Sequence, residues 1–157
     1  MTRESDKPAF LGGKPAKSRP FGRGPKHSLR EWQAIREVFE RGSIPMTRGP
    51  EVMALREQFR RLTGSRFAVS VSSGTAALHT AMGALEIGRG DEVITSPITD
   101  MGTIIAILAQ NAVPVFADVD PLTLMITPET VKARLSPHTR AVIVVHLAGQ
   151  AADVRGI

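Results

Sequence analysis

The sequence of 157 residues contains no cysteine, no tyrosine and a single tryptophan. The absence of cysteine excludes a disulfide framework, a thiolate metal site and a cysteine nucleophile. No run of 18 or more apolar residues is present, so the sequence offers no membrane-spanning helix. The first ten residues, MTRESDKPAF, lack the apolar stretch of a secretory signal. We therefore expect a cytoplasmic protein without a membrane partner.

The surplus of positive charge lies at one end of the chain. The net charge is +5, from 20 basic and 15 acidic residues. Residues 1–30 carry eight Lys or Arg against two acids, whereas residues 31–157 are nearly neutral. Aromatic residues that would stack on bases make up only 4% of the chain. This distribution is typical of a solvated leader, and we expect no nucleic-acid partner.

The chain divides by composition near residue 28. Residues 1–28 are rich in Pro, Gly, Lys and Arg, and their four prolines interrupt any helix: Pro8, Pro15, Pro20 and Pro25. We interpret this part as an extended basic arm. Ser28 and Glu31 then have the spacing of a capping box, which predicts that a helix begins there. Residues 29–157 would form the folded part.

Helical and strand patterns alternate through most of the folded part. Helical spacing is found up to Gly42 and again over Glu51–Leu62. Further helices are predicted at Ala76–Leu85, Met101–Gln110 and Pro128–Leu135. The predicted strands are Phe67–Val71, Asp91–Thr95, Val113–Ala117 and Ala141–Val145, the last apolar throughout, as in a strand buried on both faces. This alternation predicts an α/β fold of three layers, a mainly parallel sheet flanked by helices.

The loop Ser72–Thr75 is the most informative candidate for a binding site. It follows a predicted strand and opens a helix, and ligands of parallel sheets gather at this edge. Gly74 would let a ligand approach the backbone, Ser73 and Thr75 offer hydroxyls, and a helix N-terminus offers unpaired N–H groups. The pattern fits a phosphate cradle and simple helix capping equally well. It is neither a Walker A motif nor the G-x-G-x-x-G fingerprint.

Other polar residues have structural interpretations. His146 follows a predicted strand, where a histidine usually makes a fixed hydrogen bond. Asp118 and Asp120 alternate like ligands of a divalent cation, but a turn at Asp120-Pro121 explains them better. The remaining histidines are scattered, so we expect no metal site. Trp32 has the helical spacing of a core or interface residue.

Several blocks in register resemble one family. They are LGGKP at 11–15, VSSGTAAL at 71–78, GRGDEVI at 88–94, PVFADVDP at 114–121 and VHLAGQAAD at 145–153. In this order they are similar to the DegT/DnrJ/EryC1/StrS aminotransferases. The resemblance implies the large domain of fold-type I pyridoxal-phosphate (PLP) enzymes, here its N-terminal part at 29–157. It also implies a homodimer that transfers an amino group from an amino acid such as glutamate to a nucleotide-linked keto-sugar.

The resemblance assigns residues to the cofactor and reveals two departures. Ser73, Gly74 and Thr75 match the segment that binds the PLP phosphate in the family. Asp100 stands where the family places an aromatic ring against the cofactor; it would either bond cofactor or substrate, or cap the helix at Met101, which we favour. No lysine follows a predicted strand, so the PLP lysine is expected downstream of Ile157 and the isolated chain would lack a catalytic residue.

Alternatives to an aminotransferase fragment therefore stay open. One is a catalytically inactive, truncated family member that dimerises or binds phosphate. A second is a PLP-dependent sugar dehydratase, because the residue that would distinguish it lies beyond Ile157. A Rossmann-type nucleotide binder is supported only by the alternation of strands and helices, since the glycine fingerprint is absent.

Overall fold

The computed structural model describes residues 7–15, 17, 19, 27–42, 44 and 48–157. It forms two compact units, residues 1–54 and residues 55–157. The boundary between them does not fall at residue 28, where the composition changes. The division into an arm and a folded part therefore stays a prediction. The prolines at 20 and 25 lie outside the described residues.

The first unit holds a short 3-10 turn and the helix α1. The turn spans Ala9–Leu11 and α1 spans Leu29–Glu40. The predicted capping box is confirmed: the Ser28 N–H donates to Glu31 Oε2 at 2.7 Å and the Arg30 N–H donates to Ser28 Oγ at 3.2 Å. Trp32 was expected in a core or an interface, and within this unit its side chain is 61% exposed.

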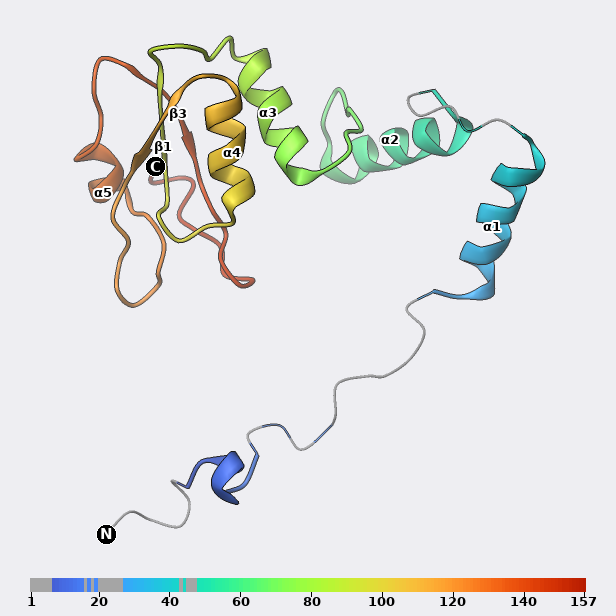
Figure 1. Ribbon diagram of the computed structural model, residues 1–157, viewed down its shortest axis with the longest axis horizontal. Helices are drawn as coiled ribbons and strands as arrows, with labels where there is room; N and C mark the ends of the chain where they lie inside the picture. Colours follow the sequence, from blue (N-terminus) through green and yellow to red (C-terminus); the bar gives the residue numbers. More distant parts are fainter. Residues whose placement is uncertain (1–6, 16, 18, 20–26, 43, 45–47) are drawn as a thin grey trace. The chain divides into compact units, whose positions relative to one another are not determined.

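Helix α2, Pro50–Thr63, spans the boundary between the units, close to the predicted bounds. The second unit continues with α3 (Gly74–Ala84), β1 (Glu92–Thr95), α4 (Met101–Ala109), β2 (Val113–Phe116), α5 (Pro128–Lys132) and β3 (Thr139–Ile143). The strands form a parallel sheet in the order β2-β1-β3 (Figure 1). The predicted parallel α/β fold is confirmed.

The side chains of β1 divide the core between two faces of the sheet. Val93 joins Met82 of α3 and Ala106 and Ile107 of α4 in one cluster, all nearly or fully buried. Ile94 joins Val131 of α5 on the other side. Alternation of side chains along the strand produces this division, and it makes three layers: α3 and α4, the sheet, and α5. Full burial of a side chain such as Ile94 contributes roughly 1.5–3 kcal/mol.

Two predicted elements end earlier than expected. Helix α5 ends at Lys132 rather than at Leu135, and the chain turns before Thr139. The Ser136 N–H donates to Thr139 Oγ1 at 3.0 Å in that turn. Strand β3 ends at Ile143 rather than at Val145.

The prediction of a strand at Phe67–Val71 is wrong for this structure. The residues between α2 and α3 are all described and form no strand. Phe67 is 80% and Val69 is 69% exposed. A strand requires a partner for its backbone groups, and here the Ala68 carbonyl instead accepts from Arg56 Nε at 2.8 Å. The local sequence has strand propensity, but the described residues provide no neighbour for it.

Candidate functional site

The start of α3 presents an open helix N-terminus. Ser73 has extended backbone, with φ −164° and ψ 168°, and its Oγ accepts from the Ala76 N–H at 3.1 Å. The other amides of the first turn have no acceptor within the helix. A Cβ built on Gly74 would meet nothing within 4 Å, and the residue does not have positive φ. Neither packing nor backbone conformation requires glycine here, so its small size leaves the surface beside these amides open.

The start of α4 lies against the start of α3. Asp100 caps α4, since its Oδ1 accepts from the Gly102 N–H at 2.7 Å. A Cβ on Gly102 would overlap Thr75 Oγ1 and lie 2.8 Å from Asp100 Oδ1. The missing side chain of Gly102 therefore admits the Thr75 hydroxyl between the two helices. The structure brings Ser73, Gly74, Thr75 and Asp100 into one neighbourhood.

Gly102 is the residue that sequence reasoning missed in this neighbourhood. A glycine in the first turn of a predicted apolar helix is a detectable signal, because glycine lowers helix stability and needs a packing reason. The packing reason at Gly102 is Thr75, which lies in another helix and far from Gly102 in the sequence. The sequence alone does not show this contact.

The loop after β1 is held by hydrogen bonds of its polar side chains. Thr95 and Ser96 are buried. Thr95 Oγ1 donates to the Ile143 carbonyl at 3.1 Å, and Ser96 Oγ accepts from the Ile98 N–H at 3.1 Å. The hydroxyls of Thr99 and Thr103 lie 2.9 Å apart. These contacts fix the path from the carboxyl end of β1 to the Asp100 cap.

His146 has the structural role that the sequence predicts. Its Nδ1 accepts from the Ala152 N–H at 3.1 Å. The chain between them turns tightly, with Ala148 at φ 50° and Gly149 at φ 87°, and Leu147 pairs with Gln150. His146 thus fixes the loop after β3.

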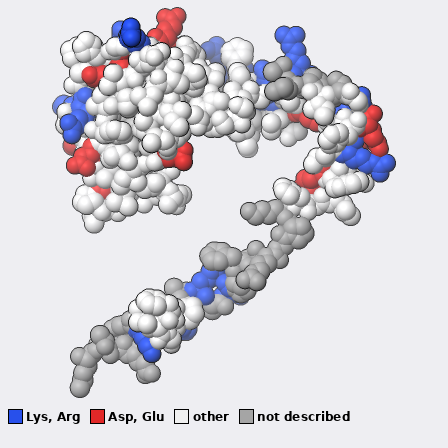
Figure 2. All heavy atoms as spheres, viewed as in Figure 1, with Lys and Arg blue, Asp and Glu red and all other residues white. Residues whose placement is uncertain are grey.

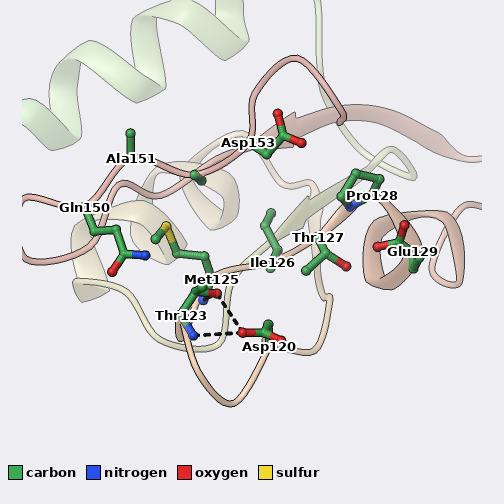
Figure 3. Close-up of a pocket in the computed structure, with 11 residues that line it drawn as sticks. Asp120, Thr123, Met125, Ile126, Thr127, Pro128, Glu129, Gln150, Ala151 and Asp153 are labelled. Atoms are coloured by element: carbon green, nitrogen blue, oxygen red, sulfur yellow. Dashed lines mark hydrogen bonds between the residues drawn. The ribbon is translucent and has the colours of Figure 1, made fainter.

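A cavity of about 480 Å³ lies between the turn after β2 and the last residues of the chain (Figure 3). It is lined by three acids, Asp120, Glu129 and Asp153, which the sequence did not predict to lie together. Each one is engaged locally: Asp120 Oδ1 accepts from the Leu122 and Thr123 amides, and Asp153 Oδ1 from the Gly156 amide. A hydrogen bond with Thr127 lowers the pKa of Glu129. The turn predicted at Asp120 is confirmed.

Charge on the second unit is mixed. Figure 2 shows acidic and basic side chains around the rim of the described part of residues 55–157, with a broad uncharged area between them. Among the residues that the structure describes, no group of three or more His, Asp or Glu could hold a metal ion. Within the same ranges, no helix has the length and apolar character needed to cross a membrane.

Comparison with known proteins decides the family. The model of the DegT/DnrJ/EryC1/StrS aminotransferase family matches residues 25–157. The chain belongs to this family. The Rossmann-type alternative loses its support, because strand–helix alternation was its only basis.

Solved structures of aminotransferases share this fold. An aminotransferase from Psychrobacter cryohalolentis is 36% identical, with a TM-score of 0.81 over 87% of this chain and 35% of its own. The aminotransferase TlmJ from Streptoalloteichus hindustanus is 42% identical, with a TM-score of 0.68 over 76% of this chain and 32% of its own. NtdA from Bacillus subtilis, with bound cofactor PMP, is 27% identical, with a TM-score of 0.76 over 90% and 34%. The chain thus spans about a third of the length of these relatives.

A putative sugar aminotransferase from Streptococcus pneumoniae is solved in a PLP form, and NtdA holds PMP. The family and these neighbours indicate PLP as the cofactor, and the fold is that of fold-type I PLP enzymes. The residues at the start of α3 fit the cofactor's phosphate. The helix N-terminus is suited to an anion, Gly74 leaves it open, and Thr75 adds a hydroxyl at the same place. The lysines that the structure describes are Lys7, Lys14 and Lys17 in the first unit, and Lys132 at the end of α5.

Proposed function

We propose that the N-terminus of α3 is the phosphate-binding cradle of a PLP-dependent sugar aminotransferase, with residues 29–157 as part of its large domain. The observation that carries the proposal is the open Gly74 at a helix start, where Ser73 already caps Ala76. The amides of Gly74 and Thr75 would donate to the phosphate oxygens. When bound, the cofactor supplies an electron sink for the transfer of an amino group.

The side chains around the cradle would have different roles in binding the cofactor. Ser73 holds the first turn of α3 in shape, so the amides point in one direction before any ligand arrives. The Thr75 hydroxyl, seated against Gly102, would donate a further hydrogen bond to the phosphate. Asp100 holds the start of α4 beside it, and its carboxylate is the group through which cofactor or substrate would be contacted.

The proposed substrates and the proposed assembly are those expected for a member of this family. We propose an amino acid such as glutamate as the donor, a nucleotide-linked keto-sugar as the acceptor, and a homodimer in the cytoplasm. The lysine that binds the cofactor covalently would lie outside these 157 residues. Lys132 ends α5, the helix that packs on the opposite face of the sheet from α3.

The test uses PMP, because it carries the phosphate but forms no covalent bond with lysine. We expect the chain to bind PMP, measured by its fluorescence, at least about tenfold more tightly than pyridoxamine, which lacks the phosphate. Thr75→Val removes one hydrogen bond to a charged group, worth roughly 1–3 kcal/mol, so PMP affinity should fall by about tenfold or more. The affinity for pyridoxamine should not change.

Thr80→Val is the matched control. Thr80 lies on the same helix, and its Oγ1 donates to the Ala76 carbonyl at 2.7 Å within that helix. The same substitution there should leave PMP affinity unchanged. Equal affinities for PMP and pyridoxamine, or equal effects of the two threonine variants, would show that α3 does not hold the phosphate.

A further inference from the structure

The carboxylate of Asp100 lies beside the Thr75 hydroxyl. Asp100 Oδ1 and Thr75 Oγ1 each lie under 3.0 Å from the position that a Cβ on Gly102 would occupy. A phosphate oxygen bound to this hydroxyl would be one hydrogen bond further from Asp100. That separation is within the screening length of about 8–10 Å, so the negative charge of Asp100 would act on any ligand held at Thr75.

The Asp100 carboxylate is only partly used within the chain. Its Oδ1 accepts from the Gly102 N–H at 2.7 Å and caps α4. Among the residues that the structure describes, the Asp100 side chain makes no second hydrogen bond and no salt bridge. Asp100 is also exposed. Its Oδ2 is therefore accessible to a ligand, and no positively charged side chain of the described residues pairs with it.

An unpaired carboxylate beside an anion site favours one kind of ligand. Like charges repel, so the carboxylate opposes a ligand whose only charged group is a phosphate. An ammonium group on the same ligand reverses this effect, because a carboxylate oxygen accepts a charge-assisted hydrogen bond from it. PMP, the amine form of the cofactor, carries both groups. The start of α3 together with Asp100 thus suits a ligand that has a phosphate and an amine.

We propose that Asp100 is a specificity-determining residue that selects PMP, through an ion pair between its Oδ2 and the ammonium group of the cofactor. The inference rests on the proposed phosphate cradle and goes beyond it, because the cradle alone does not distinguish ligands that share the phosphate. The form selected is the one that holds the amino group to be transferred. The same side chain keeps its cap on α4 through Oδ1.

The test compares PMP with pyridoxine phosphate, which has the same ring and phosphate but a hydroxyl in place of the amine. Ligand fluorescence measures binding to the chain. We expect PMP to bind about three- to fivefold more tightly, as for an exposed ion pair. Asp100→Asn removes the charge but keeps an acceptor for the cap, and Asp100→Ser does the same with a different side chain. Each variant should weaken PMP and strengthen pyridoxine phosphate, so that the ratio of affinities falls to about one.

Two controls separate this result from other causes. Thr75→Val should weaken both ligands by the same factor and keep their ratio, because the hydroxyl contacts the phosphate that they share. Asp91→Asn removes a negative charge at the other end of β1 and should leave the ratio unchanged. A ratio that both Asp100 variants leave unchanged overturns the inference but not the cradle. If Thr75→Val affects neither ligand, the cradle and the inference are both wrong.

Discussion

Single residues at the site have roles that can be separated by conservative substitutions. Asp100 is the clearest case, because its carboxylate caps α4 through the Gly102 amide and also lies beside the Thr75 hydroxyl. The sequence predicted the cap, and the structure confirms it. Contact of the same carboxylate with the cofactor is a separate role. It would depend on the charge of Asp100 rather than on its ability to accept one hydrogen bond.

Removal of the cap should destabilise the second unit. We expect Asp100→Ala to lower the free energy of unfolding by about 1 kcal/mol, because the Gly102 N–H loses its acceptor. Asp100→Asn keeps an acceptor and should be nearly as stable as the original chain in urea unfolding. PMP affinity of the Asn variant then reports on the charge: an unchanged affinity indicates a cap alone, and a changed one indicates a contact with the cofactor.

Elements of the second unit were predictable to different degrees. The helices that begin at capping residues and the three paired strands could be predicted, because caps and apolar runs are local signals. The strand at Phe67–Val71 could not be judged from its own residues, since pairing depends on a neighbour. The contact of Gly102 with Thr75 and the cavity beside Asp120 arise from packing between elements distant in the sequence, which a single sequence does not reveal.

The start of β1 is tied to neighbouring segments by one carboxylate. Asp91 Oδ2 accepts from the Gly88 N–H at 2.9 Å, and Oδ1 accepts from Arg140 Nε at 3.1 Å. These partners, Gly88 first, lower the pKa of Asp91 below its ordinary value. Its stabilising effect is therefore fully present above the unfolded-state pKa of about 3.9 and is lost as the pH falls through the lower folded-state pKa.

We expect the stability of Asp91→Asn to depend less on pH than that of the original chain below about pH 4. Urea unfolding at a series of pH values measures this. Arg140→Gln is the control: it removes the ion pair but keeps the Gly88 hydrogen bond, which is the larger cause of the pKa shift. This variant should retain most of the acid dependence, and its complete loss would assign the shift to Arg140 instead.

At the scale of the whole chain, residues 55–157 are all described and contain one lysine, Lys132. Lys132 ends α5, and α5 and α3 pack on opposite faces of the sheet. A cofactor phosphate held at Thr75 would therefore not place the aldehyde of PLP beside Lys132. This arrangement distinguishes phosphate binding, which the chain is proposed to perform, from covalent attachment.

Reductive labelling tests this arrangement. We expect PLP with borohydride to modify the lysines of the chain unselectively, without one stoichiometric site, as read by peptide mass spectrometry. Inorganic phosphate, added as a competitor, should not reduce the labelling of one lysine more than that of the others. Dominant labelling of Lys132 that Thr75→Val abolishes would place the reactive aldehyde at α5 and contradict the proposed position of the cofactor.

The central position of β1 also sets an order of events during folding. Its partner β2 follows after a single helix, whereas Thr95 of β1 reaches Ile143 of β3 across 48 residues. Closing the longer loop costs more entropy, so β1, α4 and β2 should assemble before β3 joins them. Early in folding, β1 is then itself an edge, and the backbone N–H and C=O groups that later pair with β3 are the ones that a nascent chain exposes until β3 arrives.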